Sequence, residues 1–228
     1  MHSKQGNSTK MSLNILIFLG SVRESTPPKP ARLGARVATA CRARLEATSQ
    51  HTTIIDPLDI DVQKPFKPHF AYPEGKAPAE LDTLAAQIGD ADAYVMVSPE
   101  YNHAMSPALS SLLNHFGSSL FSYKPSAIVT YSAGQWGGAR AAVNMRTFLS
   151  ELGCLPVSAM IQIPKAQEVL DENGAFYKGV DGDGWHSYFD RTLMQLNWWA
   201  RAASHQRSVD SESLPGAFKS DPAQRNAP

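Results

Sequence analysis

The segment Leu-Asn-Ile-Leu-Ile-Phe-Leu at residues 13–19, followed by Gly20 and Ser21, decides the fold class of this chain. It is an almost continuous apolar run, with no alternation of apolar and polar positions. A short run of this kind predicts a strand buried on both faces, and such strands are typical of parallel sheets. A loop with three prolines then leads into a helix that we predict over residues 31–47.

The rest of the chain alternates predicted strands and helices. We expect further strands at 51–55, 93–98, 126–131 and within 155–163. We expect further helices at 78–88, 106–120, 139–152 and 185–200. Five strands alternating with five helices predict an α/β fold, in which helices cover both faces of a parallel sheet. Five strands in one domain favour the flavodoxin-like doubly wound order, whose ligand crevice lies at the carboxyl ends of the strands.

Composition narrows the possible classes of protein. The chain has 228 residues, 43% of them hydrophobic, and its 21 basic and 21 acidic side chains cancel. This length and apolar content fit one large domain. The balanced charge excludes the basic surface of nucleic-acid binders and of polybasic membrane segments. No apolar run approaches the roughly 20 residues of a membrane span.

The ends of the chain and its cysteines suggest an organisation and a compartment. We expect a disordered segment at 1–12, one domain at 13–203 and a polar tail at 204–228. Residues 1–12 lack the apolar centre of a signal peptide. Cys41 and Cys154, the only two cysteines, form no metal motif and fit a reducing compartment. We therefore expect a cytoplasmic protein without a bound metal.

The first predicted strand ends in Gly20-Ser21-Val22-Arg23. This stretch matches neither of the common glycine-rich nucleotide motifs. It offers a hydroxyl, a guanidinium and successive backbone N–H groups ahead of a helix, which can form an anion site. Arg23 and Arg32 can pair with a phosphate in a bidentate way. A solvated loop with two surface arginines is an equally good interpretation of this stretch alone.

The second informative strand end is Ser-Pro-Glu-Tyr-Asn-His at 98–103, ahead of a helix that Ser106 and Pro107 open well. Tyr101 has a flat face and a polar tip, and the amide of Asn102 both donates and accepts hydrogen bonds. The combination suits a flat heteroaromatic ring with polar edges. The alternative is a tight turn in which Tyr101 packs on the core and Asn102 caps a helix.

The third strand end is Ser-Ala-Gly-Gln-Trp-Gly-Gly at 132–138. Its glycines allow the backbone to approach a ligand closely. The alternative for this stretch alone is a simple flexible turn, but Trp136 favours a binding surface, because a large ring on a loop often marks one. Together the three strand ends describe one crevice for a phosphate and a planar ring. They contain no convincing nucleophile–base pair, which points to a bound cofactor that performs the chemistry.

Three motifs carry a family resemblance. The stretches GSVR at 20–23, SPEYNHAMSPAL at 98–109 and YSAGQWGGARAA at 131–142 resemble the NAD(P)H-dependent FMN reductase family, which comprises flavodoxin-like quinone, azo-dye and metal-ion reductases. The resemblance covers residues 13–163. It implies that FMN is bound by Ser21, Val22, Arg23 and Arg32 at the phosphate, by Pro99, Glu100, Tyr101, Asn102 and the adjacent His103 along the ring and ribityl chain, and by Ser132, Ala133, Gly134, Gln135 and Gly137 at the pyrimidine edge.

The resemblance also implies an activity. NAD(P)H would deliver a hydride to N5 of the flavin and leave, and a quinone, flavin, azo or metal-ion acceptor would then be reduced in a ping-pong scheme. Backbone N–H groups near Gly134 would stabilise negative charge on the reduced ring. No side chain need act as acid or base. The family forms homodimers or homotetramers. The alternative function is a flavin-binding redox sensor that acts through protein partners without turnover.

Overall fold

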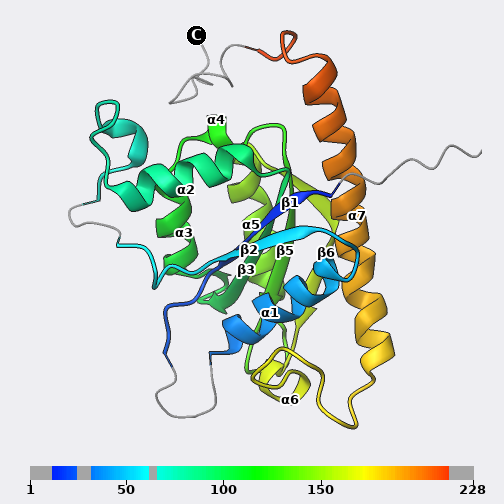
Figure 1. Ribbon diagram of the computed structural model, residues 1–228. Coiled ribbons are helices and arrows are strands. Elements are labelled where there is room, and N and C mark those ends of the chain that lie inside the picture. Colours follow the sequence, from blue (N-terminus) through cyan, green and yellow to red (C-terminus); the bar gives the residue numbers. More distant parts are fainter. Residues whose placement is uncertain (1–11, 25–31, 62–65, 216–228) are drawn as a thin grey trace, which may run out of the picture.

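The computed structural model describes residues 12–24, 32–61 and 66–215 (Figure 1). Its sheet has five parallel strands in the order β2-β1-β3-β5-β6, which is the doubly wound flavodoxin-like order and confirms the predicted fold class. A sixth, short strand pairs antiparallel with the end of β3. The strands are β1 (Asn14–Leu19), β2 (His51–Ile55), β3 (Ala93–Tyr101), β4 (Ala104–Met105), β5 (Pro125–Tyr131) and β6 (Leu155–Ile163).

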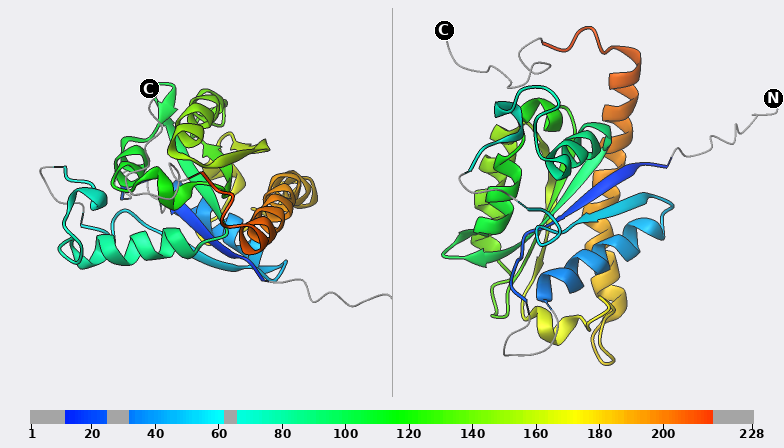
Figure 2. Two further views of the ribbon diagram at one scale, coloured as in Figure 1. Left: turned by 90° about the horizontal axis from the view of Figure 1, so that it is seen from above. Right: turned by 60° about the vertical axis from the view of Figure 1, so that its left-hand side comes forward.

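Helices cover both faces of the sheet, as Figures 1 and 2 show. One face carries α1 (Leu33–Glu46), α6 (Ala166–Val169) and α7 (Gly182–Val209). The other carries α2 (Ala79–Asp90), α3 (Pro107–Asn114), α4 (Ser118–Phe121) and α5 (Ala139–Leu152). A short 3-10 helix, η1 (His69–Ala71), precedes α2. In the part of the chain that the structure describes, none of the helices combines the length and apolar character that a bilayer crossing needs.

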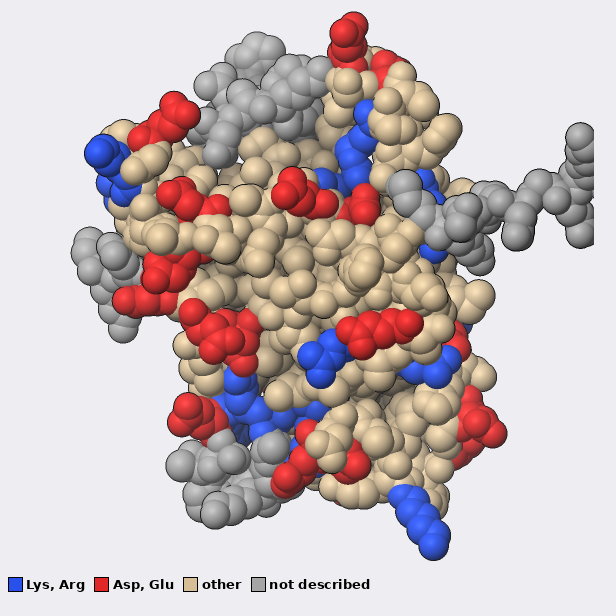
Figure 3. Space-filling view, viewed as in Figure 1, with Lys and Arg blue, Asp and Glu red and all other residues tan. Residues whose placement is uncertain are grey.

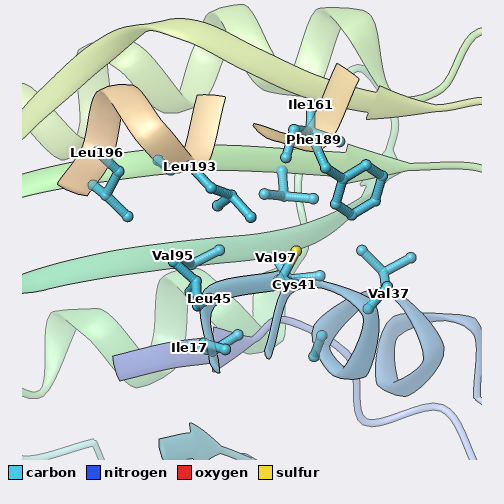
Figure 4. Packing of buried hydrophobic residues seen from close by; sticks show 14 of the residues in the cluster. Ile17, Val37, Cys41, Leu45, Val95, Val97, Ile161, Phe189, Leu193 and Leu196 are labelled. Atoms are coloured by element: carbon cyan, nitrogen blue, oxygen red, sulfur yellow. The ribbon is translucent and has the colours of Figure 1, made fainter. Parts of the chain in front are cut away.

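The strand β1 is buried on both faces, as its apolar run predicts. Ile15 and Ile17 belong to the core beneath α1 and α7, whereas Leu16 and Phe18 belong to the core on the opposite face. Figure 4 shows the first of these cores, where side chains of α1 and α7 pack against β1, β3 and β6. Burial of each such side chain contributes about 1.5–3 kcal/mol, so the sheet holds the strand ends in fixed positions.

Two helices differ from the prediction. The single helix expected at 106–120 is broken, because Gly117 has an extended backbone with ψ 150° and separates α3 from α4. The last helix continues to Val209, so residues 204–209 are helical where we expected the polar tail to begin. The rest of the expected tail beyond 215 and the expected disorder at 1–11 lie outside the described residues.

Lys124 is buried at the end of the sheet opposite to the predicted crevice. Its Nζ donates to the carbonyl oxygens of Ile88 at 2.7 Å, Gly89 at 2.5 Å and Leu120 at 3.1 Å. A cation at the last turn of a helix interacts favourably with the helix dipole. Burial nevertheless lowers the pKa of Lys124 to about 8.

The outer edge of β6 is covered by side chains. The N–H of Ala159 donates to Oε1 of Gln195 at 2.9 Å, and the N–H of Gln162 donates to the Tyr188 hydroxyl at 3.1 Å. Arg146 donates to two carbonyl oxygens of β6. The pairing with β5 also shifts register within this strand. These contacts satisfy backbone groups that an edge strand otherwise leaves open.

Candidate functional site

The three predicted strand ends meet at one edge of the sheet, at the lower end in Figure 1. The N–H of Gly20 donates to the carbonyl of Val97 at 2.7 Å, which joins the ends of β1 and β3. The hydroxyl of Ser106 donates to the carbonyl of Gly20 at 2.5 Å. Glu100 accepts hydrogen bonds from the first turn of α5, just after the third segment. The structure therefore brings the three segments together.

Position 20 requires glycine, because β3 and α3 lie too close to it to admit a side chain. An added Cβ would lie 2.5 Å from the carbonyl oxygen of Val97 and 3.0 Å from Cβ of Leu109. Ser106 is the N-cap of α3, where its hydroxyl accepts from the N–H of Leu109 at 3.1 Å. The N-terminus of α3 is thus held directly beside the first loop, where the helix dipole favours an anion.

Ser21 is buried, unlike the two residues that follow it. Its hydroxyl accepts from the N–H of Arg23 at 3.4 Å. Burial raises the pKa of Tyr131 above its usual value, so that this hydroxyl stays protonated. Val22 and Arg23 are exposed, and no carboxylate among the described residues pairs with the Arg23 guanidinium. Arg23 therefore offers an available positive charge, and its role as a phosphate ligand stays a prediction.

Arg32 lies at the first loop as expected, but its guanidinium is already paired. It forms a bidentate ion pair with Asp56, with distances of 2.8 Å from Nη1 to Oδ2 and 3.0 Å from Nη2 to Oδ1. Nη2 also donates to the carbonyl of Ser21. Its charge is thus already balanced, and its contact is with the loop itself. Nε of Arg32 is buried and has no partner among the described residues.

Asp56 is the site residue that the sequence analysis missed. It directly follows β2, and its carboxylate fixes the Arg32 side chain that holds Ser21. Its place at the carboxyl end of a strand was the available signal, because all such ends meet at this edge.

The second segment forms a hairpin where we expected a loop between a strand and a helix. β3 continues through Pro99 to Tyr101, and Tyr101 pairs with Ala104 of β4. Asn102 and His103 have φ values of 51° and 63°, as a two-residue type I′ turn requires. Pro99 is buried in the sheet, whereas Tyr101 is 43% exposed. The alternative in which Tyr101 packs on the core is wrong.

Glu100 caps α5. Its Oε2 accepts from the N–H groups of Arg140 and Ala141, both at 3.0 Å. The N-cap residue of this helix, Gly138, has no side chain and a φ of 79°. A carboxylate from β3 therefore satisfies the first turn of α5 and interacts favourably with its dipole. The hydrogen bonds of Glu100 to the backbone of α5 explain its position by themselves. The expected contact with a flavin ring is not needed for that explanation.

The third segment is a loop held by its own hydrogen bonds. The Ser132 hydroxyl donates to the carbonyl of Gly134 at 2.8 Å and accepts from the N–H of Gly137 at 2.9 Å. The N–H of Lys165 also donates to the carbonyl of Gly134, at 2.8 Å. Residues 133–135 are exposed, and an added Cβ at Gly134 would meet open space. Among the described residues no acceptor is found for the N–H groups of 133–135, whereas the N–H of Gly137 is already used.

The electrostatics of this edge are local. Figure 3 shows basic and acidic side chains close together at the lower left, where the strands end. The described residues contain no cluster of side chains suited to a metal ion. Both cysteines are buried, which raises the pKa of Cys41 and of Cys154 to about 12 and keeps them protonated. Among the described residues, this edge therefore combines positive charge with exposed loop backbone, and neither cysteine is an activated nucleophile.

Comparison with known proteins agrees with the family resemblance of the sequence motifs. A family model described as NADPH-dependent FMN reductase matches residues 13–168. The chain is 30% identical over 128 residues to an NAD(P)H-dependent FMN reductase of Pseudomonas aeruginosa, which covers 54% of this chain and 67% of that relative. It is 30% identical over 174 residues to a quinone reductase of Escherichia coli K12, with 70% of this chain and 86% of the relative covered.

Solved structures share the fold. A flavoenzyme NAD(P)H:(acceptor) oxidoreductase of Paracoccus denitrificans superimposes with a TM-score of 0.62 at 15% identity, over 84% of this chain and 98% of the other. At this identity the likeness concerns the fold alone.

Proposed function

The chain belongs to the NADPH-dependent FMN reductase family, whose members are oxidoreductases that use FMN and NAD(P)H, and from this we propose that it reduces a quinone at the carboxyl edge of its sheet. The relative named a quinone reductase, matched over most of its length, supports this choice among quinone, flavin, azo and metal-ion acceptors. One observation carries the proposal: the exposed N–H groups of 133–135 and the available charge of Arg23 belong to segments that meet at one edge.

The phosphate of FMN would be held by the first loop. Arg23 supplies the positive charge, and Val22 and Arg23 supply exposed backbone next to the N-terminus of α3. Arg32 acts as a positioning residue, since it reaches the loop through the carbonyl of Ser21 and is itself fixed by Asp56. The buried Nε of Arg32 has no hydrogen-bond acceptor among the described residues. Buried donors are normally paired, so this atom fits a site whose ligand would supply the acceptor.

The ring of FMN would be held by the third segment. The N–H groups of Ala133, Gly134 and Gln135 can donate to its pyrimidine edge and stabilise negative charge there. Tyr101, exposed on the hairpin, together with Asn102 and His103, would border the ring. Ser132, Glu100 and Gly137 hold these elements in place through hydrogen bonds within the chain. Bound there, FMN would supply the hydride chemistry, accepting from NAD(P)H and passing electrons to the quinone in separate half-reactions.

The test is spectroscopic and kinetic. Purified protein is expected to be yellow and to oxidise NADPH with a quinone, with parallel lines in double-reciprocal plots. Colourless protein that cannot be reconstituted with FMN would contradict the proposal. Rapid turnover would exclude the alternative of a sensor without turnover. Arg23→Gln is expected to weaken FMN binding about tenfold, whereas Arg191→Gln, an exposed arginine on α7, should leave it unchanged.

We also propose that the chain forms a homodimer or homotetramer, as the family resemblance implies. Light scattering after size-exclusion chromatography tests this directly, and a monomer at micromolar concentration would contradict it.

A further inference from the structure

Trp136 and Arg140 form an exposed pair next to the third segment. The indole of Trp136 is 62% exposed, and the guanidinium carbon of Arg140 lies 5.8 Å from its ring centroid. This distance is within the range of a cation–π contact. The pair therefore presents a large flat ring and a positive charge side by side on the surface.

Both side chains stand on fixed backbone. The carbonyl of Trp136 accepts from the N–H of Ala139 at 3.2 Å, and the loop before it is held through Ser132. The N–H of Arg140 is bonded to Glu100. A ring on such a loop needs little further ordering to bind a ligand, which favours affinity.

The charge of Arg140 is available. Among the described residues no carboxylate forms an ion pair with its guanidinium. Glu100, which touches the same residue, uses Oε2 for the backbone N–H. The Arg140 guanidinium can therefore bind an anion, and the Trp136 ring beside it offers a surface for stacking.

We infer that Trp136 and Arg140 bind the adenosine end of NADPH, the indole stacking on the purine and the guanidinium pairing with the 2′-phosphate. This inference rests on the proposed function and adds its dinucleotide preference. Arginine is a common partner of the 2′-phosphate of NADP, and its planar fork matches phosphate oxygens. NADH lacks this phosphate, so the pair would favour NADPH.

Free FMN shares this chemistry, because it also combines a flat heteroaromatic ring with a phosphate monoester. As an electron acceptor it could occupy the same pair. The experiments below therefore include an arm that separates the two ligands.

The kinetic test uses two variants and a matched control. Arg140→Gln is expected to lower kcat/KM for NADPH about tenfold and to leave that for NADH within about twofold. Trp136→Ala should lower both by roughly the same factor, since both dinucleotides carry the purine. Arg191→Gln is the control, because Arg191 is also exposed and lies 5.0 Å from the ring centroid of Tyr188 on α7. It should change neither.

A binding test does not depend on turnover. Titration of the purified full-length protein, with or without bound flavin, with 2′,5′-ADP should quench tryptophan fluorescence, and Trp136→Phe should remove that quench. Arg140→Gln should weaken 2′,5′-ADP about tenfold and leave 5′-AMP unchanged.

Several results would overturn the inference. These are equal losses for NADPH and NADH in Arg140→Gln, unchanged 2′,5′-ADP binding in that variant, or a quench that persists in Trp136→Phe. A change confined to FMN as acceptor, absent with riboflavin, would assign the pair to free FMN. Absence of bound flavin or of turnover concerns the proposed function, because the 2′,5′-ADP titration decides the inference alone.

Discussion

The cap that Glu100 places on α5 allows a quantitative prediction. Glu100→Ala removes the acceptor of two backbone N–H groups, each 3.0 Å from Oε2. Loss of an N-cap acceptor costs about 1 kcal/mol, and loss of a negative charge at a helix N-terminus costs about 0.3–1 kcal/mol more. With a second N–H left open, we expect a decrease of about 2 kcal/mol in the free energy of unfolding. For a chain of this size that corresponds to roughly 5 °C in Tm.

A second variant separates the two contributions. Glu100→Gln keeps an amide oxygen that can occupy the position of Oε2 and loses only the charge, so it should cost about 0.5–1 kcal/mol. Glu168→Ala is the matched control, because Glu168 forms an exposed pair with Lys165 at 3.3 Å and should matter by less than about 0.5 kcal/mol.

Urea denaturation at neutral pH, with FMN saturating every variant, measures these differences. Equal losses in Glu100→Ala and Glu100→Gln, or a loss in Glu100→Ala no greater than in Glu168→Ala, would refute the assignment of Glu100 as a cap.

Three further predictions follow from the contacts described above. Asp56→Asn leaves Arg32 partly buried without its counter-charge, so unfolding free energy should fall by about 2 kcal/mol and FMN binding should weaken with it; unchanged flavin affinity would contradict the role given to this pair. Gly20→Ala places a Cβ 2.5 Å from a backbone oxygen and should destabilise the protein by about 1–3 kcal/mol in urea melts, whereas a neutral result would show that the loop can move. Burial lowers the pKa of Lys124 to about 8, so the folded protein releases this proton before the unfolded chain does. Stability due to Lys124 should therefore rise between about pH 8 and 10.5, by roughly 3 kcal/mol. The difference in unfolding free energy between wild type and Lys124→Met should grow by that amount over this range; a difference independent of pH would contradict it.

The sequence predicted the central sheet because burial on both faces leaves a clear pattern. The continuous apolar runs at 13–19 and 93–98 correspond to β1 and most of β3. The location of the site at the carboxyl ends of the strands could be predicted from the order of strands and helices alone. The extension of β3 did not, since Pro99 and Glu100 are residue types that normally end a strand. Asn102 and His103 also lack the Asn-Gly signature of a two-residue hairpin.

Individual roles at the site depend on contacts that local sequence does not record. The N-terminus of α5 begins after a glycine and has no local capping side chain, so nothing near it indicates a cap from Glu100 on β3. Arg32 and Asp56 are brought together only because β1 and β2 are neighbours in the sheet. The residue types thus predicted a phosphate site, while only the fold separates Arg23, which is available, from Arg32, which is already paired.

The side chains along β6 affect how this protein behaves when it is concentrated. An open edge strand is a template on which another molecule can add a strand, and such addition begins fibrous aggregation. Gln195, Tyr188 and Arg146 already bond to the backbone groups that a second molecule would need. Strand addition at this edge must first break those bonds. The described part of β6 therefore resists the growth of one sheet into another. Molecules that meet on that side make contact through side chains.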